Sequence, residues 1–337
     1  MEFQERSIAE DYEHIVQNRR PLIIDCDTGT DDAIMLIAAA GCGVFDIRAV
    51  TSAVGNVSQE NTSKNNLDIA EYLGWDVPVA RGAYKTMYAG KRTLSTVHGA
   101  TGLGDVTIPG AKRMQFEEER APEVIYRIAK EEEGNLELLV TGPMTNIAIA
   151  LLLYPDLKDL IKRITFMGGA MEGGNVVPHA EFNIWFDPVA ANIVFTSGIP
   201  LLMIGLDVTE RASLIDDDRK KFMSFNTRAG DLAANLLAFM LKREDNGLES
   251  AYMHDGLALA ACADPLCVTT KKAHIRVEVL NDALSGKTYV ELDPKDESKV
   301  NAQVAVDLYF HRFRVWLHEA VARIRNDVQV AAKYDLR

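Results

Sequence analysis

The sequence predicts an α/β fold, a single domain with a mostly parallel central sheet flanked by helices. Short apolar runs alternate with longer helical patterns along the chain, an arrangement typical of parallel strands joined by right-handed helical crossovers. The first of these runs is continuous, as in strands that are covered on both faces. Several runs end in acidic or amide residues, and ligands of open α/β sheets bind beyond the carboxyl ends of the strands. We therefore expect the functional site at that edge.

The first strand and helix enclose an unusual group of carboxylates. Residues 22–24 form a short apolar run that ends in acid, and residues 28–30 supply a turn with a candidate helix cap. Residues 33–40 are apolar almost throughout, which suits a buried helix. Four acidic side chains fall within eight residues at this junction: Asp25, Asp27, Asp31 and Asp32.

Such a group calls for a compensating positive charge or for hydrogen-bond donors. Carboxylates this close raise one another's pKa unless a cation or donors stabilise the charged forms. Oxygen ligands alone favour Ca²⁺ or Mg²⁺ over zinc. The alternative is an acidic helix start at residues 30–32, favoured by the helix dipole, with Asp25 and Asp27 as turn residues.

Two other acidic signatures differ from this segment at required positions. An EF-hand loop that starts at Asp25 requires Gly at its sixth position and Glu at its twelfth, where the chain has Thr30 and Leu36. A haloacid dehalogenase phosphatase requires D-x-D-x-T, but the fifth position here is Gly29. The EF-hand is thereby excluded, and the phosphatase is kept as a minor alternative.

Composition narrows the class of protein. The 337 residues are 47% hydrophobic and 25% charged, typical of a globular protein with a large core. The net charge of −13 makes nucleic acid an improbable partner and suits a small neutral substrate or a cation. The first twenty residues lack the apolar core of a signal peptide, and no run is long enough to span a membrane. We expect a cytoplasmic enzyme with four reduced, mostly buried thiols: Cys26, Cys42, Cys262 and Cys267.

The remaining elements follow from apolar runs and helical periodicity. A short helix at residues 7–17 lies within an N-terminal extension of residues 1–20, and residues 21–337 form the main domain. Further strands are expected at 45–54, 77–80, 136–140, 164–166 and 200–204. Further helices are expected at 57–74, 117–133, 147–153, 216–242 (two helices) and 257–262. Residues 274–280, 287–292 and 303–309 form a small antiparallel extension, followed by a closing helix at 311–325.

Polar residues that follow these strands are candidates for the site. Asn56 follows the second strand, although a simple turn would explain it equally well. Residues 84–110 lack periodicity and contain His98; a loop this long is usually functional or disordered. The turn T-G-P-M-T-N at 141–146 repeats the strand, turn and helix layout of the first unit. Four glycines at 168–174 precede acid and amide residues, which indicates close backbone approach. His254 and Asp255 precede an apolar helix and could be no more than a cap.

Together these segments resemble the nucleoside hydrolase family. The family's first signature is D-x-D-P-G-x-D-D-A after an apolar strand, and here it reads DCDTGTDDA, with Thr28 in place of Pro. The second resembles M-G-G-A, then G-N, then E-F-N-x-x-x-D-P, which spans residues 167–188. The His-Asp pair at 254–255 matches a third motif at a helix start. The resemblance covers residues 21–325.

The resemblance implies roles for individual residues. Ca²⁺ would be held by Asp27, Asp32, Asp255 and the carbonyl of Thr141, and Asp27 would be the general base. The 141–146 turn could otherwise be a plain connection. Asp31, Asn175, Glu181 and Asn183 would hold the ribose, with Asn56 at the same edge. His98 would lie near the base in a mobile loop, unless that loop is an ordinary surface segment. His254 would face the leaving group.

The implied function is calcium-dependent hydrolysis of the N-glycosidic bond of ribonucleosides to ribose and base, as in nucleoside salvage. The residue types suit it, because carboxylates around the sugar favour an oxocarbenium-like transition state. A calcium-dependent nucleoside-binding protein without turnover is the alternative from another class. The family implies a homodimer or homotetramer, and His254 favours a non-specific or pyrimidine-directed enzyme over a strictly purine-directed one.

Overall fold

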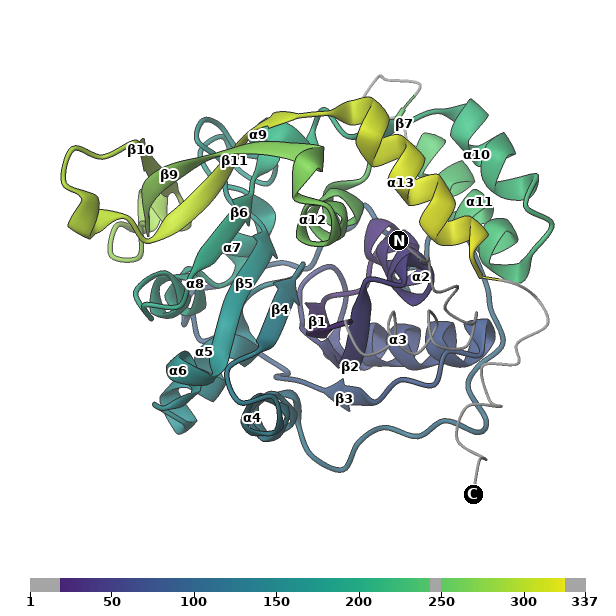
Figure 1. Ribbon diagram of the computed structural model, residues 1–337, viewed down its shortest axis with the longest axis horizontal. Helices are drawn as coiled ribbons and strands as arrows, with labels where there is room; N and C mark the ends of the chain where they lie inside the picture. The colour runs from purple at the N-terminus through teal and green to yellow at the C-terminus, as the bar shows by residue number, and fades with distance from the viewer. Residues whose placement is uncertain (1–18, 243–249, 325–337) are drawn as a thin grey trace, which may run out of the picture.

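A nine-stranded sheet runs through the protein, and helices cover both of its faces (Figure 1). The computed structural model describes residues 19–242 and 250–324. The strands lie in the order β10-β9-β11-β6-β5-β4-β1-β2-β3. Their bounds are β1 Arg20–Cys26, β2 Phe45–Ser52, β3 Val79–Arg81, β4 Leu136–Val140, β5 Ile161–Met167, β6 Leu201–Ile204, β9 Val268–Val277, β10 Thr288–Leu292 and β11 Ala302–Leu308. A separate two-stranded sheet pairs β7 (Ser213–Leu214) with β8 (Ala251–Tyr252).

The sheet is mostly parallel, as the sequence predicts. Every pair from β6 through β5, β4, β1 and β2 to β3 is parallel. Strand β11 then pairs in parallel with β6 and antiparallel with β9, and β10 closes the edge antiparallel to β9. The antiparallel extension is therefore continuous with the central sheet.

Successive residues of β1 face opposite sides of the sheet and join two separate cores. Leu22 and Ile24 belong to one core and Ile23 to the other, and all three are fully buried. The first core includes residues of α2 (Thr30–Cys42), α3 (Gln59–Leu73), α10 (Asp216–Met223), α11 (Arg228–Leu241), α12 (His254–Ala263) and α13 (Phe310–Ala322). The second core includes residues of α4 (Ala121–Glu131), α5 (Thr145–Leu153), α7 (Phe182–Phe186) and α8 (Pro188–Phe195). Two short helices, α6 (Leu157–Leu160) and α9 (Leu206–Thr209), complete the set for the described residues.

Helix α2 is buried over most of its length and carries the acids Asp31 and Asp32 of the first motif. Eleven of its thirteen residues are buried. Its N-cap is Gly29, whose backbone N–H donates to the carboxylate of Asp32 at 2.9 Å, so an acidic side chain satisfies a free amide of the first turn. The helix ends before Gly43, which adopts φ of 72°. The acids of the motif are thus fixed at the start of a rigid helix.

The expected elements agree with the structure in type and order, with local differences. Helix α4 begins only at Ala121, because Pro122 is suited to a first turn. Helix α12 begins three residues earlier than expected, at His254. Helix α7 was not predicted, since its five residues are too few to show periodicity. The expected helix at residues 7–17 lies outside the described residues. No helix or strand lies between Arg81 and Ala121, a stretch that includes residues 84–110, where the sequence shows no periodicity.

The structure also bears on membrane association. Across residues 19–242 and 250–324, we find no helix with both the length and the apolar character needed to cross a bilayer.

Candidate active site

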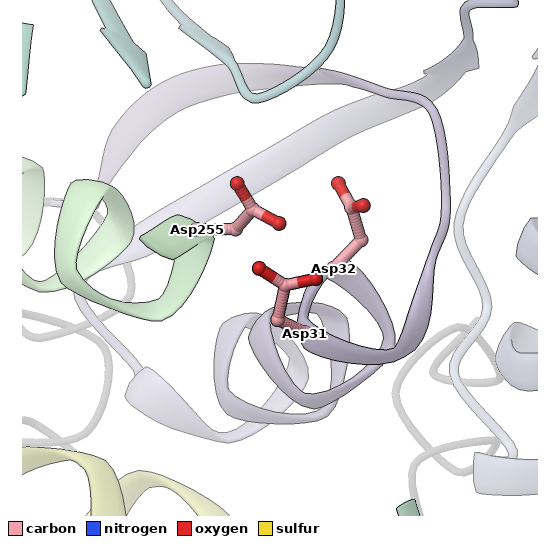
Figure 2. Close-up of side chains that lie close together, drawn as sticks. All are labelled: Asp31, Asp32 and Asp255. Atoms are coloured by element: carbon pink, nitrogen blue, oxygen red, sulfur yellow. The ribbon is translucent and has the colours of Figure 1, made fainter. Parts of the chain in front are cut away.

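Two helix starts bring three carboxylates face to face (Figure 2). Asp31 and Asp32 lie in the first turn of α2, and Asp255 lies in the first turn of α12. All three side chains are buried, and one oxygen of each lies within 4.8 Å of the others. Both helices start at the carboxyl edge of the sheet, because α2 follows β1 directly and α12 packs against α2 in the same core. This group could hold a metal ion.

Asp27 lies beside this group but is not part of it. Its Oδ2 accepts a hydrogen bond from the backbone N–H of Asn56 at 2.7 Å, and the side chain is completely buried. Two glycines make room for it: a Cβ at Gly55 would lie 2.1 Å from Asp27 Oδ2, and a Cβ at Gly142 would lie 3.0 Å from Asp27 Cβ. The structure thus gathers Asp31 rather than Asp27 most closely with the other two acids.

The electrostatics of these acids show that their charge is uncompensated. Burial and, to a smaller extent, neighbouring Asp31 raise the pKa of Asp32 to about 7. Burial and the neighbouring acids also raise the pKa values of Asp27 and Asp255 well above the usual range. In the described parts of the chain, none of these three carboxylates forms a salt bridge with Lys or Arg.

Within the described chain, Asp27 and Asp31 each also have one oxygen without a hydrogen-bond partner. Asp27 Oδ1 and Asp31 Oδ1 are buried and accept no hydrogen bond from the described residues. Buried polar atoms are normally satisfied, and an unpaired carboxylate oxygen inside a protein is costly. A hard cation with oxygen ligands would satisfy both atoms and neutralise the charge. The residues present therefore fit a divalent metal.

The turn after β4 is fastened to this acidic region. The Thr141 hydroxyl donates to Asp32 Oδ1 at 2.8 Å, and the Thr141 backbone N–H donates to the carbonyl of Asp25 at 2.9 Å. Asn146 donates to Asp25 Oδ1 at 2.8 Å. Burial raises the pKa of Asp25 to about 6, and its hydrogen bonds with Thr51 and Asn146 oppose that shift. The two strand ends are thus joined by side chains from the motifs themselves.

A cavity of about 540 Å³ opens beside the acids. Its lining contains the following nine of the eleven residues that the sequence singles out: Asp31, Asn56, His98, Thr141, Asn175, Glu181, Asn183, His254 and Asp255. The other two, Asp27 and Asp32, lie behind this lining. Asp27 accepts a hydrogen bond from the backbone N–H of Asn56 at 2.7 Å, and Asp32 accepts one from the side-chain amide of Asn56 at 3.2 Å. All predicted residues therefore come together.

Glu181 forms one wall of the cavity with its carboxylate held by backbone amides. Its oxygens accept hydrogen bonds from the N–H groups of Gly169, Asn183 and Ile184 at 2.9, 2.8 and 3.1 Å. Gly169 adopts φ of 72°, which explains a glycine there. Burial raises the pKa of Glu181 to about 7, although the amide donors favour the charged form. Asn175 is exposed and accepts a hydrogen bond from the N–H of Phe182 at 2.9 Å.

Two histidines occupy different parts of the lining. Thr209 Oγ1 lies 2.8 Å from Nδ1 of His254, and the ring of Tyr252 packs 5.6 Å from that of His254. His98 lies at the start of α2, where its Nδ1 accepts the backbone N–H of Thr30 at 3.1 Å. An accepting Nδ1 places the proton of a neutral imidazole on Nε2.

Comparison with known proteins identifies the family of the chain. The family model described as "Inosine-uridine preferring nucleoside hydrolase" matches residues 22–315. The chain belongs to this family. It is accordingly an enzyme that hydrolyses the N-glycosidic bond of ribonucleosides.

Relatives and solved structures agree with this assignment. A pyrimidine-specific ribonucleoside hydrolase RihA of Photobacterium profundum is 38% identical over 90% of this chain and 99% of its own. The protein of the same name from Escherichia coli O1:K1 / APEC is 37% identical over 86% of this chain and 94% of its own. A purine-preferring ribonucleoside hydrolase from Gardnerella vaginalis superposes with a TM-score of 0.85 at 34% identity, covering 90% of this chain and 99% of that one.

This nucleoside hydrolase has cavity residues that sequence reasoning missed. Tyr252, Glu210 and Met240 line the cavity, as do residues 93–97. None lies in a motif, and their positions depend on how α9, α11 and the long loop fold over the sheet edge. The sequence holds one signal for Glu210. Thr209 and Glu210 are polar and come shortly after the strand at 201–204, as the candidate site residues do after other strands.

Proposed function

We propose that this nucleoside hydrolase is a calcium-dependent enzyme of nucleoside salvage that acts best on pyrimidine ribonucleosides and releases free ribose and base. One observation supports this above all: a single cavity is lined by carboxylates and amides that suit a sugar, and also by His254 and Tyr252, which suit a base. The cavity has the size of a small-molecule site.

The metal site proposed here combines Asp27, Asp32, Asp255 and the carbonyl of Thr141. The unpartnered oxygen of Asp27 and the raised pKa values of all three acids support it. The close approach of Asp31 to Asp32 and Asp255 makes Asp31 a further candidate ligand or a ribose contact at the same ion. When bound, Ca²⁺ would neutralise these acids, polarise a water molecule and accept the ribose 2′ and 3′ hydroxyls as ligands.

Asp27 is the proposed general base. Its buried Oδ1 accepts no hydrogen bond from the described residues, which leaves one lone pair for a cation and the other for a proton from the attacking water. Its other oxygen is held by the N–H of Asn56 at 2.7 Å, which fixes the side chain in place. A fixed base beside the bound sugar lowers the entropic cost of the attack.

The ribose would be held by Asp31, Glu181, Asn175 and Asn183, with Asn56 beside them. Glu181 is fixed by three backbone donors and lines the cavity, so its oxygens can also accept hydrogen bonds from sugar hydroxyls. Negative charge around the sugar also stabilises the positive charge that develops on the ring in the transition state.

His254 is the proposed acid for the departing base, with His98 close to the base as well. Thr209 at 2.8 Å from Nδ1 orients the ring of His254, and only part of the side chain is buried. A nucleobase leaves poorly as an anion at neutral pH, and a positioned acid contributes typically about 10² to 10⁴-fold in rate. The pyrimidine preference rests on His254 and on the relatives named as pyrimidine-specific.

A steady-state panel tests this function. Purified enzyme with Ca²⁺ is assayed on uridine, cytidine, inosine and guanosine, and both ribose and free base are measured. We expect equal amounts of ribose and base, without added phosphate, and higher kcat/KM for the pyrimidine nucleosides. A higher kcat/KM on inosine and guanosine would refute the pyrimidine preference. Tight binding of nucleosides without ribose release would refute the hydrolytic mechanism.

A further inference from the structure

Residues 93–97 form a wall of the cavity without being tied to the rest of the protein by hydrogen bonds. All five line the cavity. Within the described chain, the only hydrogen bond recorded for them joins the N–H of Val97 to Ser95 Oγ at 3.3 Å, inside the segment itself. A hydrogen-bonded residue flanks the segment on each side, Arg92 before it and His98 after it. His98 is held by Thr30 at the start of α2.

Arg92 holds the other end through four contacts. Its Nε donates to the carbonyl of Trp185 at 2.7 Å, and one terminal nitrogen donates to Ser285 Oγ at 2.8 Å. Its guanidinium carbon lies 4.0 Å from the ring centroid of Tyr88 and 4.3 Å from that of Trp185. Stacking on aromatic faces combined with directed hydrogen bonds is a use of arginine that lysine cannot reproduce.

The partners of Arg92 are themselves part of the site's support. Trp185 lies in α7, the helix that begins after Glu181 and contains Asn183. Ser285 lies in the connection between β9 and β10, and the following Gly286 packs so tightly on α7 that a Cβ there would lie 2.5 Å from Trp185 Cα. Arg92 therefore joins the loop to the ribose side of the cavity and to the antiparallel extension of the sheet.

Neighbouring contacts position the loop before it reaches Arg92. The N–H of Met87 donates to Asp187 Oδ2 at 2.7 Å, and the Tyr88 hydroxyl donates to Asp282 Oδ1 at 3.4 Å. Asp187 also accepts the hydroxyl of Thr145 at 2.7 Å, which links this anchor to the turn after β4. The chain is thus held up to Arg92 and again at His98, with five cavity-lining residues between.

We propose that Arg92 is a positioning residue that fixes residues 93–97 over the bound substrate, and that the β9–β10 connection serves the active site through it. The inference rests on the proposed function, in which this cavity binds a ribonucleoside. Loss of the Arg92 contacts would release one end of the segment, so that substrate binding must first order it. The effect should fall mainly on KM, because Arg92 is absent from the cavity lining itself.

The test compares Arg92→Ala, Arg92→Lys and the matched control Lys91→Ala, which removes the same charge from an exposed neighbour. Hydrogen–deuterium exchange of the peptide covering residues 93–97 reports the position of the segment without any need for activity. We expect faster exchange there in Arg92→Ala, and a rise of about tenfold in KM for uridine with a smaller change in kcat. Arg92→Lys should recover only part of the loss, and Lys91→Ala should match the wild type.

Several outcomes would contradict the positioning role of Arg92. Wild-type exchange and wild-type KM in Arg92→Ala would show that the segment does not depend on Arg92. A loss confined to kcat would place Arg92 in the chemistry instead. If Arg92→Ala fails to fold, Ser285→Ala removes one bond alone and should still raise exchange at residues 93–97; unchanged exchange there contradicts the proposal. A wild-type enzyme that does not hydrolyse uridine would refute the proposed function. The exchange measurement would still show whether Arg92 positions residues 93–97.

Discussion

The side-chain amide of Asn183 donates a hydrogen bond to the carbonyl oxygen of Thr141 at 2.8 Å. It also lies 3.2 Å from the carbonyl of Met167. Asn183 therefore joins the end of β5 to the turn after β4, and Thr141 in turn donates to Asp32. A carbonyl oxygen has two lone pairs, so that of Thr141 can accept from Asn183 and also face a cation.

This relationship predicts that Asn183 serves both the sugar and the metal site. Replacing Asn183 with Ala leaves a buried carbonyl without its donor and frees the turn that carries Thr141. We expect kcat/KM for uridine to fall by about 10²-fold, the scale of a misplaced catalytic group. Asn192→Ala, the same change at an exposed position of α8, is the control. Wild-type kinetics in Asn183→Ala would show that Asn183 has no role in substrate or metal binding.

A second prediction concerns the sugar. Polar groups arranged to satisfy a hydroxyl are left unpaired when the hydroxyl is missing, and such sites discriminate by roughly 10⁴-fold or more. The fixed carboxylate of Glu181 and the unpartnered oxygen of Asp31 are groups of this kind. We expect kcat/KM for 2′-deoxyuridine to lie at least about 10⁴-fold below that for uridine. Similar values for the two substrates would show that the ribose is not held through its hydroxyls.

His254 gives a third prediction, which separates proton donation from positioning. His254→Ala is compared on uridine and on p-nitrophenyl riboside, whose leaving group departs without protonation. As an acid, His254 should matter for uridine by about 10² to 10⁴-fold and little for the nitrophenyl substrate. Thr209→Val, which removes the oxygen 2.8 Å from Nδ1, should give a smaller loss of the same pattern. Equal losses on both substrates would assign His254 to ribose or metal positioning.

The fourth prediction uses the raised pKa of Glu181. Burial raises this pKa from 4.5 to about 7 in the folded protein. The folded state then binds the proton more tightly than the unfolded state, so Glu181 contributes stability at low pH that is lost as pH rises toward 7. Between pH 5.5 and 8.5 the wild type should lose about 2 kcal/mol of unfolding free energy relative to Glu181→Gln.

Denaturant unfolding of the two proteins at both pH values measures this difference. Taking the difference between variants cancels the contributions of the other acids. A gap between wild type and Glu181→Gln that stays constant with pH would mean that the three backbone donors offset the burial of the carboxylate.

The sequence carried enough information to predict the sheet and the acidic region. Residues 136–140 are apolar except for Glu137, and they form β4 with the bounds expected from the sequence. Asp31 and Asp32 of the first motif also meet Asp255, because the carboxyl ends of parallel strands meet at one edge of the sheet. Local patterns were sufficient here, since the strands are buried on both faces and the helices follow them directly.

Other parts of the site depend on contacts between distant segments. Arg92 reaches Trp185 and Ser285, 93 and 193 residues further along the chain, and nothing in the local sequence indicates either partner. Likewise, the closest group of acids contains Asp31 rather than Asp27, because the side chain of Asp27 turns toward the backbone of Asn56. Side-chain direction at a turn is set by packing, which spacing along the sequence does not report.

The central claim is that ribonucleoside hydrolysis depends on a cation held by the buried acids. The most direct measurement is ribose release from uridine by enzyme treated with a chelator, then by the same enzyme given Ca²⁺, with Asp32→Ala in parallel. The account predicts loss of activity on chelation, recovery with Ca²⁺ and no recovery in Asp32→Ala, because the acids at this site have no other compensating charge. Full uridine hydrolysis by metal-free enzyme, or by Asp32→Ala, would contradict it.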